Sequence, residues 1–103
     1  MEIKLKKPLE INGEKIEKIS MNFDEISALD YCKASAAAQK KTGADAISFA
    51  EFDSAFHLYI GFFAIMAGNK KIALFDLEKQ IKGADLLIIS REARNFFMST
   101  IPD

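Results

Sequence analysis

LEINGEKI, at residues 9–16, is the stretch that decides how the fold begins. Its centre, Asn12-Gly13, supplies two residues that adopt positive φ readily, as the two-residue type I′ turn between antiparallel strands requires. On both sides of the turn apolar and charged side chains alternate, which is typical of half-buried strands. The stretch therefore predicts a β-hairpin. The pairs nearest to the turn are then Leu9 with Ile16 and Glu10 with Lys15.

The predicted hairpin covers residues 1–22, and its far end does not keep the register of the turn. The apolar residues of the second arm alternate on the face opposite to Ile16. One extra residue in a strand corrects such a mismatch. We expect this bulge near Glu17 or Lys18, opposite Pro8, which has no N–H to donate. The bulge would pair Leu5 with Met21 and Ile3 with Phe23.

Beyond the hairpin the apolar period changes from two to about 3.6, which predicts helices. Glycine or proline follows each helical segment and is a natural stop. The predicted helices cover residues 23–42, 46–67, 72–82 and 85–99. The sequence thus predicts an α+β fold in a single domain, with an N-terminal hairpin followed by three or four packed helices.

The first predicted helix has an alanine-rich second half. Asn22 or Asp24 can cap its start. The stripe expected to face the core is Ile26, Leu29, Cys32 and Ala36. On this stripe Cys32, the one cysteine of the chain, is expected to act as a small buried hydrophobe rather than as a nucleophile.

The predicted helix at residues 46–67 is apolar nearly all round in its second half. One face carries Phe49, Phe52, Phe56, Tyr59, Ile60, Phe63 and Met66, and the opposite face carries Leu58, Phe62 and Ile65. Such a helix must be covered on two sides. A chain of 103 residues has little surface with which to do this.

The last predicted helix, with Asp85 as its cap, carries Leu86, Ile89, Ala93, Phe96 and Phe97 on one face and its two arginines elsewhere. Two interpretations of the aromatic excess stay open. In the first, the phenylalanines fill the core of a monomer. In the second, which we prefer, the residues Leu58, Phe62, Ile65, Phe96 and Phe97 form a partner-binding surface for another subunit or a partner helix.

Composition excludes several classes of protein. Lys and Arg number 14 against 15 Asp and Glu, so no basic field attracts nucleic acid. The longest apolar run, at residues 55–67, is shorter than the roughly 20 residues that cross a bilayer. Residues 1–7 alternate charged and aliphatic side chains, so we expect no export leader and a reducing cytosolic setting. We expect neither nucleic-acid nor membrane partners.

His57 is the one candidate for acid–base chemistry near neutral pH. Asp53 lies one turn before it on the same helix, and such a pair can orient an imidazole or bind a metal. No third ligand is evident, and we therefore interpret His57 as a structural residue that bonds to Asp53 or to water. We expect no catalytic residues, no metal and no cofactor, and hence no enzyme.

The arrangement resembles the small tail assembly chaperones of Mu-like and related contractile-tailed bacteriophages and prophages. The resemblance begins with the proline-bearing arm and Asn-Gly turn of residues 3–16 and continues through FDEISALD at 23–30. The long apolar helix ending in Ala67-Gly68 and the final segment from Asp85 to the phenylalanine pair resemble the middle and the last helix of that family.

This resemblance implies a protein that binds the tape measure protein during tail morphogenesis. Such a chaperone helps tail tube subunits to assemble around its client, works in the cytoplasm of the bacterial host and is absent from the mature virion. A homo-oligomer is an open alternative for its assembly state. The alternative function is that of a small structural virion subunit, in the tail or connector, that polymerises through the hairpin edge. A third hypothesis is an enzyme that uses His57 and Asp53.

Overall fold

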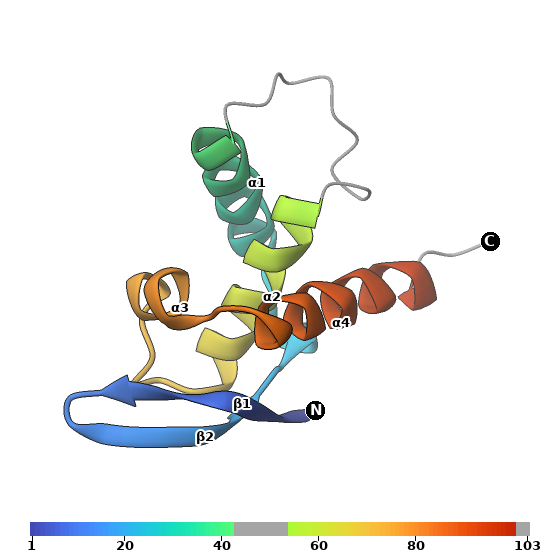
Figure 1. The fold of residues 1–103 in the computed structure, drawn as a ribbon. Helices are drawn as coiled ribbons and strands as arrows, with labels where there is room; N and C mark the ends of the chain where they lie inside the picture. The colour runs from blue at the N-terminus through green and yellow to red at the C-terminus, as the bar shows by residue number, and fades with distance from the viewer. Residues whose placement is uncertain (43–53, 101–103) are drawn as a thin grey trace.

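A computed structural model of the chain describes residues 1–42 and 54–100. The described residues form an α+β fold, in which an antiparallel hairpin precedes a 3₁₀ turn and four α-helices (Figure 1). The elements are β1 (Glu2–Ile11), β2 (Glu14–Ser20), η1 (Phe23–Glu25), α1 (Ala28–Thr42), α2 (Ser54–Gly68), α3 (Leu74–Gln80) and α4 (Ala84–Thr100). The predicted fold class is confirmed.

The turn of the hairpin has the predicted conformation. Asn12 and Gly13 have φ values of 53° and 81°, so both lie in the left-handed region that a type I′ turn needs. Leu9 is paired with Ile16, and Glu10 with Lys15. The pairs predicted beside the turn are therefore confirmed.

The irregularity in the hairpin lies in β1, and the prediction that it lies in β2 is wrong. Residues 5–8 of β1 stand opposite the single residue Glu17, and beyond them Lys4 pairs with Lys18 and Ile3 with Ile19. Leu5 therefore does not pair with Met21, nor Ile3 with Phe23. In this region β1 has three residues more than β2. Because three is an odd number, the side chains of β1 change from one face of the sheet to the other across the bulge, as the apolar pattern requires. The bulge in β1 is in contact with α4.

That contact is made by Asp85, a buried residue near the start of α4. The backbone N–H of Lys6 donates to its Oδ1 at 2.9 Å, and that of Lys7 donates to its Oδ2 at 3.0 Å. One carboxylate thus satisfies two amides that the bulge removes from the ladder. Asp85 was expected to cap its own helix, but it lies inside α4 and its carboxylate holds the bulge instead.

α2 is the centre of the helical layer. It contacts α1, α3, α4 and η1, and it contacts β2 at the hairpin. Its residues Phe56, Ile60 and Ile65 are fully buried. This arrangement provides the two-sided cover that the apolar helix needs. The start predicted for it at residue 46 lies outside the described residues.

Two glycines let neighbours approach α2 closely. A Cβ on Gly61 would lie 2.5 Å from Cγ2 of Ile89 in α4, and one on Gly68 would lie 2.9 Å from the carbonyl oxygen of Ser20. Both distances are shorter than a Cβ contact tolerates. The lack of a side chain at these positions therefore sets the spacing of α4 and of β2 from α2.

The segment predicted as one helix at 23–42 is divided. η1 ends at an extended residue, Ile26, and α1 begins only after Ser27. The Oγ of Ser27 accepts from the N–H of Asp30 at 3.1 Å, and Oδ2 of Asp30 accepts from the N–H of Ser27 at 3.2 Å. This capping box makes Ser27 the cap of α1, in place of the predicted Asn22 or Asp24.

The new start also changes which face of α1 is buried. Ala34 and Ala38 face the core, whereas Leu29, Cys32 and Ala36 are exposed. The predicted stripe and the predicted burial of Cys32 are therefore wrong. Small side chains let α1 lie close to α2, and this close approach decides the face.

Candidate partner-binding surfaces

The five residues predicted to bind a partner occupy different environments. Phe62 and Ile65 are 2% and 0% exposed, so the expectation that they remain on a surface patch is wrong. Leu58 is half-buried and packs against the core. Phe96 is half-buried, and the side chain of Phe97 lies outside what the structure describes. Only Leu58 and Phe96 remain accessible among the described ones.

Other apolar side chains are exposed instead. Leu29 in α1, Phe75 in α3 and Leu87 in α4 are 62%, 67% and 68% exposed. Tyr31 and Met98 are exposed to a smaller extent. The molecule therefore does present apolar side chains to solvent, but on α1, α3 and α4 rather than on α2.

The first candidate surface surrounds η1, and we call it the η1 surface. Its residues are Phe23, Asp24, Glu25, Ile26, Asp30 and Tyr31. Three adjoining hollows meet there, and the most apolar of them, of about 350 Å³, is lined by Phe23, Ile26, Tyr31 and Phe96 among others. The surface thus has an apolar centre.

Local packing fixes that centre. The rings of Phe23 and Phe96 stack at 4.9 Å with an angle of 14° between their planes, which ties η1 to α4. The ring of Tyr31 meets that of Phe56 edge-on at 5.0 Å. The N–H of Asn22 donates to the carbonyl of Ala64 at 3.0 Å. These contacts hold η1 to α2 and α4, and the rings of Phe23, Tyr31 and Phe96 line the apolar hollow.

Negative charge lies around the apolar centre. Among the residues that line the three hollows, Asp24, Glu25 and Asp30 carry acidic side chains, Lys70 carries a basic one and Met1 carries the α-ammonium, which leaves a net negative charge. Within the described residues neither Asp24 nor Glu25 lies within ion-pair distance of a basic side chain. The η1 surface is therefore acidic, although the whole chain is nearly neutral with a formal charge of -1.

The second candidate surface, the Phe75 surface, consists of Tyr59, Phe75, Glu78 and Lys79, which line a hollow of about 380 Å³ between α2 and α3. The Tyr59 hydroxyl donates to Oε2 of Glu78 at 2.6 Å. Burial and then the Glu78 carboxylate raise the pKa of Tyr59 to about 12. Nζ of Lys79 lies 5.8 Å from the centre of the Phe75 ring. Phe75 therefore stands as an exposed aromatic residue beside a fixed polar pair.

His57 lies away from these surfaces. It is 2% exposed, and it is not among the residues that line the four hollows described above. Asp53, its expected partner, lies outside the described residues. In the described part of the chain no three His, Cys, Asp or Glu side chains are placed to hold a metal ion. Burial of the imidazole gives no support to the hypothesis that His57 acts on a substrate.

Sequence reasoning missed the η1 surface because it continued one helix through residues 23–42. The missed signal is the capping box, Ser27-Ala28-Leu29-Asp30, which marks a helix start five residues later than the one predicted. With the helix starting there, Phe23 and Ile26 precede α1 and Leu29 turns outward.

Comparisons with protein-family models, with curated proteins and with solved structures find no match for this chain. Over the residues that the structure describes, no helix combines the length and the apolar character needed to traverse a lipid bilayer.

Proposed function

We propose that this chain is a phage or prophage tail assembly chaperone that binds a helical segment of the tape measure protein in the cytoplasm of the bacterial host. The proposal is supported by the resemblance of the proline-bearing arm and Asn-Gly turn, and by an α+β fold with a hairpin before the helices. In this proposal the chain has no catalytic role and is absent from the finished virion.

The observation that carries the proposal is the exposed aromatic ring of Phe75, which the fold leaves outside its core. An aromatic side chain in a partner interface contributes more than its share of binding free energy, above all beside polar groups that orient the partner. Glu78 and Lys79 flank Phe75 with opposite charges. A helix that places an apolar residue against Phe75 and polar residues on either side of it fits this surface.

The contacts of β1 argue against the alternative of a subunit that polymerises through the outer edge of β1, one of the two edges of this two-stranded sheet. The free edge of β1 is already occupied, because the N–H of Glu10 donates to Oε1 of Gln80 at 2.7 Å and Nε2 of Gln80 donates back to the Glu10 carbonyl at 2.9 Å. Asp85 takes the next two amides. A further strand cannot pair with an edge whose donors are satisfied in this way.

The test is co-expression of this chain with the tape measure protein from the same genome. We expect the two to co-purify and the client to become more soluble. Phe75→Ser should reduce the recovered client by about tenfold, the usual scale for loss of an interface aromatic residue. Lys82→Ser, another exposed position, is the control and should change nothing. Absence of both co-purification and solubilisation would refute the proposal, and finding the chain in purified particles would favour the structural subunit.

A further inference from the structure

The exposed side of α4 carries a pattern unlike the rest of the surface. Leu87, Arg91, Arg94 and Met98 follow one another at spacings of four and three residues and are all exposed. We call these four residues the α4 stripe. At about 100° per residue they lie on the side of the helix opposite to the buried Ile89 and Ala93. The stripe has apolar ends and a basic middle, and at 1.5 Å per residue it is about 16 Å long.

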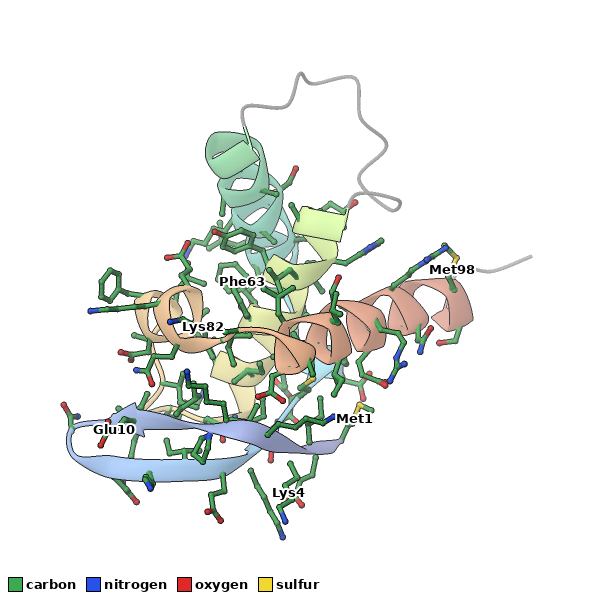
Figure 2. All side chains as sticks on the ribbon, in the orientation of Figure 1. Met1, Lys4, Glu10, Phe63, Lys82 and Met98 are labelled. Atoms are coloured by element: carbon green, nitrogen blue, oxygen red, sulfur yellow. The ribbon has the colours of Figure 1, made fainter. Side chains whose placement is uncertain are left out.

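The α4 stripe is also accessible. Figure 1 shows the second half of α4 extending away from the hairpin, and Figure 2 shows Met98 at this free end. In the described part of the chain neither Arg91 nor Arg94 lies within ion-pair distance of a carboxylate. Two uncompensated guanidinium groups thus stand on this helix, while two uncompensated carboxylates, Asp24 and Glu25, stand on the η1 surface.

We propose that the η1 surface of one copy receives the α4 stripe of a second copy. The apolar centre around Phe23 and Ile26 takes the leucine or methionine of the stripe, and the carboxylates of Asp24 and Glu25 pair with the arginines. Guanidinium–carboxylate pairs of this kind can form two parallel hydrogen bonds, which fixes the orientation of the incoming helix as well as adding attraction.

Charge selects this arrangement over the simpler pairing of two α4 stripes. Placing two copies of α4 face to face brings Arg91 and Arg94 against the same residues of the other copy, and such like-charge contacts are repulsive. The acidic surface around η1 is of opposite sign and is apolar at its centre. Because each copy carries both surfaces, the contact joins copies head to tail, into a closed pair or ring where its rotation closes and into an open filament where it does not.

This inference goes beyond the proposed function and does not depend on it. The Phe75 surface, assigned to the client, lies on α2 and α3, whereas the self-contact uses η1, the start of α1 and α4. Self-association is measured on the purified chain alone. A failure to bind the tape measure protein therefore leaves it untouched, and a monomeric chain leaves the proposed function untouched.

The experiment measures the mass of the purified full chain by sedimentation equilibrium at low salt, up to about 100 µM, a concentration that reveals affinities in the micromolar range. Wild type should self-associate, and the association should weaken as salt screens the exposed charges. Arg91→Glu with Arg94→Glu should weaken it by at least about tenfold, and Asp24→Lys with Glu25→Lys should do the same.

Mixing the two charge-reversed variants is the decisive step. Each retains one native surface, so an equimolar mixture should associate although neither variant does so alone. The matched controls lie on the hairpin: Lys4→Glu with Lys18→Glu changes the net charge by as much as the arginine variant, and Glu2→Lys with Glu17→Lys as much as the acidic one. All four positions are exposed, and both controls should associate like wild type.

Three results would overturn the proposal: a wild-type chain that stays monomeric at low salt, an association that neither reversal weakens, or a mixture of variants that fails to recover it. The second result would indicate another occupied surface, such as Leu29 in α1. Circular dichroism of each variant, measured first, checks that the helices are intact. With intact helices, a loss of association results from the loss of the contact between copies and not from unfolding.

Discussion

α1 and α2 each have 15 described residues, yet they are held in the fold in opposite ways. α2 buries large side chains on both faces and touches the elements around it. In α1 the small side chains of Ala34 and Ala38 are buried, whereas those of Leu29 and Cys32 are exposed to solvent. The difference shows that apolar spacing identifies which residues of a helix can be buried. The distance to the neighbouring helix then decides which of these residues are buried.

The largest expected effect comes from replacing one large apolar residue in each helix, which tests whether α1 and α2 differ in how they are buried. Ile65→Ala in α2 removes a fully buried side chain and should lower the free energy of unfolding by about 2–5 kcal/mol. Leu29→Ala in α1 removes a side chain that is 62% exposed and should change it by less than about 0.5 kcal/mol. Urea unfolding of both variants gives the two numbers. Equal losses would mean that α1 buries its outer face after all.

The next largest effect concerns Tyr59, a polar group on the buried helix. Tyr59→Phe leaves Glu78 without its hydroxyl donor and should cost about 1.5–3 kcal/mol. The cost depends on pH. The pKa of Tyr59 in the folded state, about 12, lies above the ordinary tyrosine value of 10.0, so the folded state favours the neutral hydroxyl. Its contribution is complete below pH 10 and is lost as the pH rises towards 12.

The measurement is chemical denaturation of wild type and of Tyr59→Phe at several pH values. The difference in unfolding free energy should shrink between pH 10 and about 12. Absorbance titration of a Tyr31→Phe variant, which keeps Tyr59 as its one tyrosine, locates the ionisation directly. A difference that stays constant over this range would show that the hydroxyl does not face the carboxylate.

A smaller effect on the free energy of unfolding is expected from exchanging glycine and alanine in the two helices. Gly61→Ala should destabilise α2 by about 1 kcal/mol or more, because its Cβ meets a branched carbon of Ile89, although alanine favours a helix. The reverse change on the exposed face of α1, Ala36→Gly, should cost about 0.5–1 kcal/mol through propensity alone. Thermal unfolding measures both. If Gly61→Ala stabilised the chain, the contact with α4 would be looser than the structure has it.

The smallest effect is that of Cys32. Because its side chain is exposed on α1, Cys32→Ser should change the free energy of unfolding by less than about 0.5 kcal/mol. The native thiol should also react completely with a thiol reagent without denaturant. Reaction only after unfolding would place Cys32 on the core side, as its spacing with Leu29 first suggested.

The parts of the fold that the sequence predicted are those that depend on adjacent residues. The Asn12-Gly13 turn and the all-round apolar α2 are of this kind. The bulge was placed in the wrong strand, because the carboxylate that stabilises it comes from Asp85, 79 positions away from Lys6. No local pattern contains that contact.

The candidate surfaces were predicted less well than the fold. Large apolar side chains on α2 suggested a docking patch, but they are the residues that the other elements cover. The exposed ones, Phe75 and Leu87, lie on helices that touch the core through other faces, and their own spacing gives no sign of exposure. Phe96 alone was expected at a surface and also lines the hollow beside η1.

The bond from Asp85 to the bulge also has a consequence for biosynthesis. Translation delivers β1 before α4, so until α4 has been made the amides of Lys6 and Lys7 lack the carboxylate of Asp85 as their acceptor. These two hydrogen bonds of the hairpin therefore form only after α4 has been synthesised. A chain halted before α4 would release a product in which the amides of Lys6 and Lys7 lack the Asp85 carboxylate as their acceptor.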